Sequence, residues 1–275
     1  MISLVDDSLE KRGFSTPPMS ATYAATGIVL AWSDHWEADR RYSLFTREYG
    51  KIEALARGSH KPLAKLSPHL EMPAELQIMF ARGRQYELII GVNRMKAFPT
   101  VCKDLSRLLL ARNALHLVDI GLKPHEPDPV LYDVLMRWLA FLDVNPSFTS
   151  ERSGFLLASF ALKLLSIIGY RPQLTHCLSC KSILVPGAYR WHALKGGVVC
   201  RSCTEREQEQ WFASRAMTDE ALKLLRYAME NDFASQLRLH LSGTVLAEFH
   251  EAVESLIISH FPTIPANSLR AACFV

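Results

Sequence analysis

Two Cys-x-x-Cys pairs constrain the fold of this 275-residue chain more than any other feature of its sequence. A pair with this spacing lets two thiolates reach one metal ion from a tight turn, and a second pair about twenty residues later completes a closed tetrathiolate site. Four thiolates leave no coordination position open for a reactive water molecule. We therefore predict one structural Zn²⁺ ion per chain, with the ligands Cys177, Cys180, Cys200 and Cys203.

Disulfide bonds and a redox-active dithiol are the alternatives to zinc. Disulfides require an oxidising compartment, and the first residues, Met1–Ser8, lack the basic segment and apolar core of a secretion signal. A redox dithiol is possible for a single pair, but two pairs on either side of a hairpin-like segment favour a metal. The most apolar run, Phe155–Tyr170, is too short for a membrane span and contains Lys163. We therefore expect a cytoplasmic protein.

The segment between the two pairs has the pattern of a β-hairpin. Tyr189–Cys200 alternates bulky and small residues around Gly196–Gly197, which predicts two short strands joined by a tight turn. Such a hairpin between Cys pairs is typical of a zinc ribbon. His176 and His192 lie close enough in sequence to compete as ligands, but two intact Cys-x-x-Cys pairs favour the cysteines.

Short runs typical of β-strands occupy the chain from Thr22 to about residue 98. Gly, Pro or charged residues separate them, and the runs are Thr26–Trp32, Tyr42–Thr46, Gly50–Ala56, Ala74–Phe80 and Tyr86–Ile90. Five short strands with no long helix between the first three are typical of a small closed barrel. We therefore predict an N-terminal OB-type β-barrel.

Helical periodicity replaces the strand pattern after residue 98. Amphipathic helices are predicted at Val101–Val118 and Pro127–Leu142, and Glu151–Ile168 is apolar on nearly every face, as expected of a central helix. Two further helices are predicted, one from about Thr218 and one at Thr244–His260. The predicted fold class is α+β: an OB-type barrel followed by an α-helical domain with an inserted four-cysteine zinc ribbon.

These patterns divide the chain into four parts. Residues 1–21 mix charges with Ser and Pro and have little apolar periodicity, so we predict a flexible leader. The barrel domain is predicted at residues 22–98 and the helical domain at residues 99–275. The zinc ribbon is predicted at residues 175–204, inside the helical domain.

Basic side chains gather in the predicted barrel, although the net charge of the whole chain is only +3. Aromatic residues lie among them, namely Trp32, Trp36, Tyr42, Phe45, Tyr49 and Tyr86. A positive groove with rings for base stacking is how OB folds hold single strands. The alternative is that the rings fill the barrel and the charges form an ordinary solvated surface. The candidate DNA-binding residues are Arg40, Arg41, Arg47, Arg57, Lys61, Lys65, Arg82 and Arg84.

No motif for a chemical step stands out. The sequence contains no Gly-x-x-x-x-Gly-Lys-Ser/Thr loop, no Gly-x-Ser-x-Gly and no His-Glu-x-x-His, and the first Cys pair lacks the upstream His-x-Glu of zinc deaminases. His125, Glu126 and Asp128 form an acidic and histidine group, but this arrangement is more typical of an exposed loop with a helix cap at Asp128. We therefore predict that the protein is not an enzyme.

Specific segments resemble one known family. In the barrel they are Glu37–Arg40, Leu44–Thr46, Ala56–Gly58, His69–Glu71 and Ala81–Arg84, and in the helical part Leu164–Pro172 leads into Cys177–Cys180. Together with the order of the parts, these segments resemble the zinc-containing type of the RecO family of bacterial recombination mediators. The resemblance extends from about residue 22 to the C-terminus, where Ser268–Phe274 is similar to the family's closing segment.

The resemblance implies a DNA-binding protein that acts without catalysis. It implies binding to single- and double-stranded DNA, annealing of complementary strands, and action with RecR to help RecA replace single-strand-binding protein. The helical domain is then expected to receive the C-terminal tail of single-strand-binding protein in an apolar groove edged by Arg or Lys. Two other hypotheses stay open: a zinc-ribbon protein-interaction adaptor without direct DNA binding, and a zinc-dependent nucleic-acid hydrolase.

Overall fold

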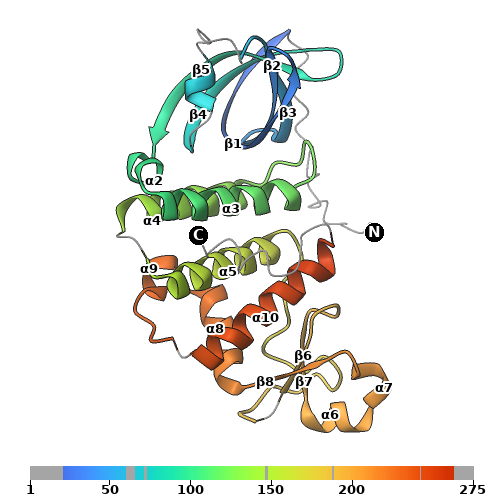
Figure 1. Ribbon diagram of the computed structural model, residues 1–275. Helices are drawn as coiled ribbons and strands as arrows, with labels where there is room; N and C mark the ends of the chain where they lie inside the picture. The colour runs from blue at the N-terminus through green and yellow to red at the C-terminus, as the bar shows by residue number, and fades with distance from the viewer. Residues whose placement is uncertain are drawn as a thin grey trace, which may run out of the picture.

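A barrel, a layer of helices and a small sheet follow one another through the molecule (Figure 1). The structure is a computed structural model that describes residues 21–59, 66–70, 73–145, 148–187, 189–241 and 243–262. The leader predicted at residues 1–21 lies outside the described residues apart from Ala21. Within the described ranges, the predicted α+β class is confirmed, with the four cysteines in the small sheet region.

The N-terminal strands close into a barrel with the order β1-β2-β3-β5-β4. Neighbouring strands are antiparallel, except that β3 and β5 are parallel. This is an OB-like arrangement, as predicted. The elements are β1 Thr22–Trp36, β2 Asp39–Thr46, β3 Gly50–Ala56, the short helix α1 Ser67–Leu70, β4 Ala74–Ala81 and β5 Glu87–Ala97.

Alternating apolar residues build the inside of this barrel. In β4, the side chains of Leu76, Ile78 and Phe80 are fully buried, and the residues between them face outward. The strands β1 and β5 run several residues further than predicted, to Trp36 and Ala97. Backbone pairing with β2 and β4 continues through these polar stretches, and a hydrophobic pattern does not report such pairing.

Helices form the middle of the molecule. The predicted single helix at Val101–Val118 is wrong: it is two helices, because the side chain of Asp104 accepts a hydrogen bond from the amide of Arg107 and caps a new helix there. No helix in the described part of the chain has both the length and the apolar composition needed to cross a membrane. The elements are α2 Pro99–Lys103, α3 Leu105–Gly121, α4 Pro129–Val144, α5 Ser150–Ile167, α8 Asp219–Glu230, α9 Phe233–Gln236 and α10 Gly243–His260.

The outer face of the barrel packs on the helices. Ile28 and Phe45 belong to the same apolar core as α3, α4 and α5, and the rings of Phe45 and Tyr132 are 5.4 Å apart. A second, separate core fills the inside of the barrel. At the junction, the ammonium of Lys51 lies 2.9 Å from a carboxylate oxygen of Asp119. The barrel is thus fixed to the helices by apolar and ionic contacts.

The ribbon is a small sheet with the order β7-β6-β8. The predicted hairpin is present, but the turn spans residues 193–196, and Gly197 is the first residue of β7. A side chain at Gly197 would clash with the carbonyl oxygen of Gln173, at 2.8 Å from the Cβ position. The third strand was not predicted. The elements are β6 Tyr189–His192, β7 Gly197–Cys200, α6 Arg201–Arg206, α7 Gln208–Trp211 and β8 Arg215–Met217.

Candidate metal centre and nucleic-acid interface

The sulfur atoms of Cys177, Cys180, Cys200 and Cys203 all lie within 4.8 Å of one another. The Sγ atoms of Cys180 and Cys200 are 4.0 Å apart. Zn–S bonds of about 2.3 Å in tetrahedral geometry place sulfur atoms about 3.8 Å apart. The four thiols can therefore hold a metal ion with little movement.

Backbone hydrogen bonds shape both halves of this cluster. The amide of Cys177 donates to the carbonyl of Ser182 at 2.9 Å, and the amide of Lys181 donates to the carbonyl of Cys177 at 3.1 Å. Lys181 takes the left-handed conformation, with φ of 60°. The second pair begins at the end of β7, where the amide of Cys200 donates to the Sγ atom of Cys177 at 3.4 Å. The two pairs are thus aligned by the fold.

The acidities of the thiols differ, as expected for thiols crowded around one point. Hydrogen bonds from Ser182 lower the pKa of Cys180 to about 6. A hydrogen bond from Ser179 lowers the pKa of Cys203, but burial and the neighbouring thiols outweigh it and raise that pKa to about 11. Several thiolates this close repel one another unless a cation lies between them. The donor set and its geometry match a soft divalent ion such as Zn²⁺.

The two histidines near the pairs are not part of the cluster. The ring of His192 is buried and packs edge-on against Trp211, with centroids 5.6 Å apart. Burial lowers the pKa of His192. His176 contacts the hydroxyl of Thr175 through Nδ1 at 3.0 Å. Neither histidine ring therefore belongs to the group of four close cysteines.

Aromatic and arginine side chains meet at the tip of the β1–β2 hairpin. The guanidinium of Arg40 lies 4.2 Å above the Trp32 ring, and the guanidinium of Arg41 lies 5.9 Å from the Tyr86 ring. The His35 ring contacts the Tyr86 ring edge-on, with centroids 5.7 Å apart. We call this group the hairpin-tip cluster; its members are Trp32, His35, Trp36, Arg40, Arg41 and Tyr86.

Carboxylates moderate the charge of this cluster. Arg40 lies 3.5 Å from Asp34, and Arg41 lies 3.9 Å from Glu53. Arg41 and Glu53 are both exposed, so their ion pair is weak and a phosphate can replace the carboxylate at small cost. The Arg40 side chain is only 14% exposed, between Asp34 and the Trp32 ring. Trp36 is 72% exposed. A ring this accessible can stack on a base.

Three other predicted residues, Arg57, Arg82 and Arg84, lie in loops next to strands of the barrel. Arg57 follows the end of β3, where the amide of the next residue, Gly58, donates to Asp39 at 2.8 Å. Arg82 and Arg84 are exposed in the loop that leads to Tyr86. Lys61 and Lys65 lie outside the described residues.

The remaining predicted basic and aromatic residues lie elsewhere. Arg47 points to the helices, with its guanidinium 3.1 Å from a carboxylate oxygen of Asp133 and 5.6 Å from the Tyr132 ring. Tyr42 and Phe45 are fully buried. The alternative interpretation, that the rings fill the barrel, is confirmed for Tyr42 and is wrong for Phe45, whose ring packs outside the barrel against Tyr132 of α4. His35 was missed because a single histidine between a carboxylate and a tryptophan has no signature of its own.

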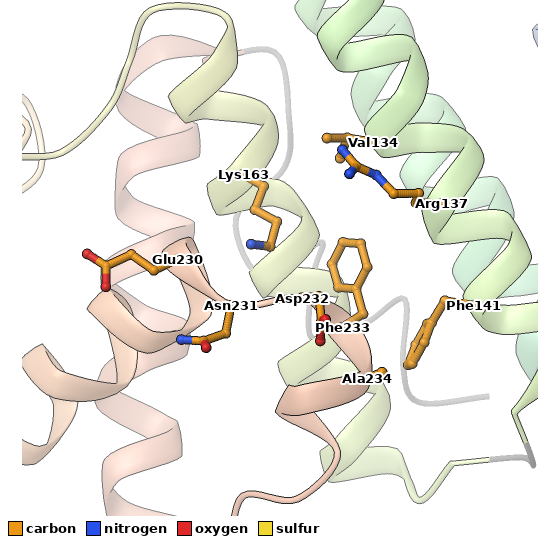
Figure 2. Close-up of a pocket in the computed structure, with 9 residues that line it drawn as sticks. All are labelled: Val134, Arg137, Phe141, Lys163, Glu230, Asn231, Asp232, Phe233 and Ala234. Carbon is orange, nitrogen blue, oxygen red and sulfur yellow. The ribbon is translucent and has the colours of Figure 1, made fainter.

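A pocket of about 380 Å³ opens between α4, α5 and the α8–α9 connection. Figure 2 shows the Phe233 ring between Lys163 on one side and Arg137 and Phe141 on the other. The Lys163 ammonium donates to the carbonyl of Met229 at 2.9 Å and lies 5.7 Å from the Phe233 ring. Burial lowers the pKa of Lys163 to about 8. The pocket thus combines aromatic walls with two cations, Arg137 and Lys163, and two carboxylates, Glu230 and Asp232.

The group at His125–Asp128 makes structural hydrogen bonds to the barrel and to α4. The side chain of Asp128 accepts a hydrogen bond from the amide of Leu131 at 2.9 Å and caps α4, as predicted. His125 donates its backbone amide to the carbonyl of Lys51 and has a positive φ. These contacts explain the segment as part of the barrel–helix junction.

Comparisons with known proteins cover both halves of the chain. Residues 19–98 match the family described as Recombination protein O N terminal, and residues 102–270 match Recombination protein O C terminal. A protein of Geobacter metallireducens named DNA repair protein RecO is 34% identical over 242 residues, which are 88% of this chain and 93% of that relative. A protein of Symbiobacterium thermophilum with the same name is 30% identical over 241 residues, which are 87% of this chain and 92% of that relative.

Proposed function

The chain belongs to the RecO family of DNA repair proteins, and we propose that it acts as a DNA-binding recombination mediator without a chemical step. In this proposal it binds single- and double-stranded DNA and anneals complementary strands. With RecR, it helps RecA to replace single-strand-binding protein. Such a mediator works in the bacterial cytoplasm, at the chromosome.

The hairpin-tip cluster is the observation that carries this proposal. It brings together two exposed indole rings, Trp32 and Trp36, and two guanidinium groups, of which Arg40 lies over Trp32 and Arg41 lies near the Tyr86 ring. Annealing requires that phosphate repulsion falls while bases stay accessible. Guanidinium groups reduce phosphate repulsion by replacing counterions, and stacking on exposed rings keeps the bases accessible. Neither effect needs a nucleotide fuel or a bond-breaking group.

We propose a DNA-binding surface that combines the cluster with neighbouring basic residues: Arg40, Arg41, Arg57, Arg82 and Arg84. Lys61 and Lys65 are proposed to join it, since they follow Arg57 closely in the chain. Arg47 is engaged by Asp133 at the barrel–helix junction, so we leave it out of the proposed surface and use it as a control.

We also propose that Cys177, Cys180, Cys200 and Cys203 hold one Zn²⁺ ion. When bound, the ion supplies structural stabilisation, because ligand binding energy in such a site is folding energy. Cys177 and Cys203 are buried in the core that α5 and α8 share with the ribbon. The four cysteines therefore connect the ribbon to the helical layer, and no DNA contact is assigned to them.

The pocket around Phe233 is our proposed receptor for the C-terminal tail of single-strand-binding protein. An acidic, apolar peptide end needs cations for its carboxylates and aromatic surface for its side chains. Arg137 and Lys163 offer the cations, and Phe141 and Phe233 offer the surface. These four residues are our proposal for the apolar groove, edged by Arg or Lys, that the family resemblance implied in the helical domain.

Oligonucleotide binding as a function of salt tests the DNA proposal. In a variant with alanine at Arg40, Arg41, Arg57 and Arg84, we expect weaker single-strand binding, slower annealing and a log–log salt slope smaller by about 0.7 for each lost phosphate contact. The Arg47→Ala control should keep the wild-type slope. Unchanged affinity and slope in the four-residue variant contradict the proposal. Firm binding to RecR or to the tail peptide without DNA binding favours the adaptor hypothesis instead.

A further inference from the structure

The carboxylate of Glu207 joins the two halves of the cysteine cluster from outside. Its Oε2 atom accepts a hydrogen bond from the hydroxyl of Ser179 at 2.9 Å, and Ser179 lies inside the first Cys pair. The same oxygen accepts a hydrogen bond from the indole Nε1 of Trp211 at 3.0 Å. Glu207 follows the second pair, and its own amide donates to the carbonyl of Cys203 at 3.0 Å. One side chain thus links the turn of the first pair to the helices after the second.

Glu207 also directs a cation toward a cysteine sulfur. Its Oε1 atom accepts hydrogen bonds from Arg206 at 2.7 Å and 3.2 Å. The nitrogen of Arg206 that makes the shorter bond lies 3.8 Å from the Sγ atom of Cys203 and donates to it. Four thiolates around one divalent ion carry a net charge of about −2, so a positive donor to sulfur stabilises the loaded site.

The surroundings of Glu207 make this network rigid. Trp211 is 2% exposed, and its ring lies 4.1 Å below the ammonium of Lys195. The ring therefore has little freedom to turn its Nε1 donor away from Glu207. A carboxylate has enough acceptor positions for Ser179, Trp211 and Arg206 at once. A glutamine at this position has one acceptor oxygen and directs an amide donor at one of the three partners.

We propose that Glu207 is a positioning residue of the metal site. Glu207 holds the turn of the first Cys pair against the second pair and directs Arg206 toward the Cys203 sulfur. The inference rests on the proposed metal site and adds an outer layer to it. Groups in this position commonly change metal affinity by about 10- to 100-fold when they are removed.

Zinc competition against a chromophoric chelator tests the role of Glu207. We expect the Glu207→Gln variant to bind zinc about 10- to 100-fold more weakly than the wild type. Glu205→Gln is the matched control, because Glu205 is also acidic and near the second pair but pairs with the exposed Arg201. It should bind zinc as the wild type does.

Cobalt substitution separates positioning from general stability. In the Co²⁺-loaded protein, loss of the Arg206 hydrogen bond to Cys203 should shift the thiolate-to-cobalt charge-transfer bands in Glu207→Gln and leave them in place in Glu205→Gln. If Glu207→Gln does not fold, Trp211→Phe removes the Nε1 hydrogen bond to Glu207 and should weaken zinc binding by about 2- to 13-fold. If these variants keep the zinc affinity of the wild type and, when loaded with Co²⁺, its spectrum, the inference alone is overturned. A wild-type protein that binds no zinc overturns the metal site itself.

Discussion

Replacement of Trp36 by alanine tests most directly whether the hairpin-tip cluster holds bases. The ring is 72% exposed, and the ring contact it makes is a T-shaped one with His35 at 5.9 Å between centroids, so the ring has surface accessible to a base. One face of Trp32 is instead covered by Arg40 at 4.2 Å. Stacking on an aromatic ring contributes about 1 to 3 kcal/mol per base. The Trp36→Ala variant should therefore bind a single-stranded oligonucleotide about 5- to 160-fold more weakly.

Fluorescence anisotropy of a labelled single strand at several salt concentrations measures both the affinity and its salt slope. An indole carries no charge, so Trp36→Ala should keep the wild-type slope, whereas Arg41→Ala should reduce it by about 0.7 if one phosphate contact is lost. Removal of an exposed ring should change the free energy of unfolding by less than about 0.5 kcal/mol. Wild-type affinity in a folded Trp36→Ala protein would refute base stacking at this site.

Two other predictions concern the junction and the pocket. Asp119→Asn should lower the free energy of unfolding by about 1.5 to 3 kcal/mol in urea titrations, because the Lys51 ammonium is only 15% exposed. Asp133→Asn, the control, breaks a half-exposed pair and should cost less than about 1 kcal/mol. At the pocket, the affinity for an acidic tail peptide, measured by calorimetry, should fall as pH rises through about 8, where Lys163 loses its charge. A Lys163→Met protein should lack this dependence. Burial lowers the pKa of Lys163 from 10.5 to about 8, so the charged form destabilises the folded state. This destabilisation should disappear, and the free energy of unfolding should rise, as pH increases from about 8 to 10.5. Peptide affinity that is independent of pH in the wild type contradicts the role of Lys163.

Local chemistry made the ribbon and the barrel predictable. The spacing of the cysteines restricts them to one side of a short turn, and the sulfur atoms of Cys177 and Cys200 indeed lie in the same cluster. Alternation along β4 reports a strand with one buried face, and Ile78 is buried there as the pattern predicts. Helix caps are equally local, so Thr218 was identified from its position alone and accepts a hydrogen bond from the amide of Ala221.

Long-range packing explains what the sequence did not predict. Leu44 and Phe45 are consecutive buried residues at the end of β2, and nothing in the sequence identifies α4 as the element that covers Phe45 and, just after the strand, engages Arg47. The pocket draws Arg137, Lys163 and Phe233 from three separate helical segments. Charge counts along the chain therefore included Arg47 among DNA-binding candidates, although a carboxylate from a distant helix engages it.

Metal removal should affect the two ends of the molecule differently. The barrel and the ribbon lie at opposite ends of the helical layer (Figure 1). The inside of the barrel has its own core, whereas Cys177 and Cys203 belong to the core of the helices. Loss of the metal should therefore loosen the ribbon and helices first and leave the hairpin-tip cluster intact.

A Cys200→Ser protein, or the wild type after chelation, should accordingly unfold at a lower temperature in calorimetry. Its salt slope for single-strand binding should equal that of the wild type, because the cysteines make no phosphate contacts in our proposal. A smaller slope in the metal-free protein, with the barrel still folded, would place the ribbon in the DNA interface. Binding of the tail peptide should weaken instead, since Lys163 and Phe233 are held by helices that pack in the same core as the ribbon.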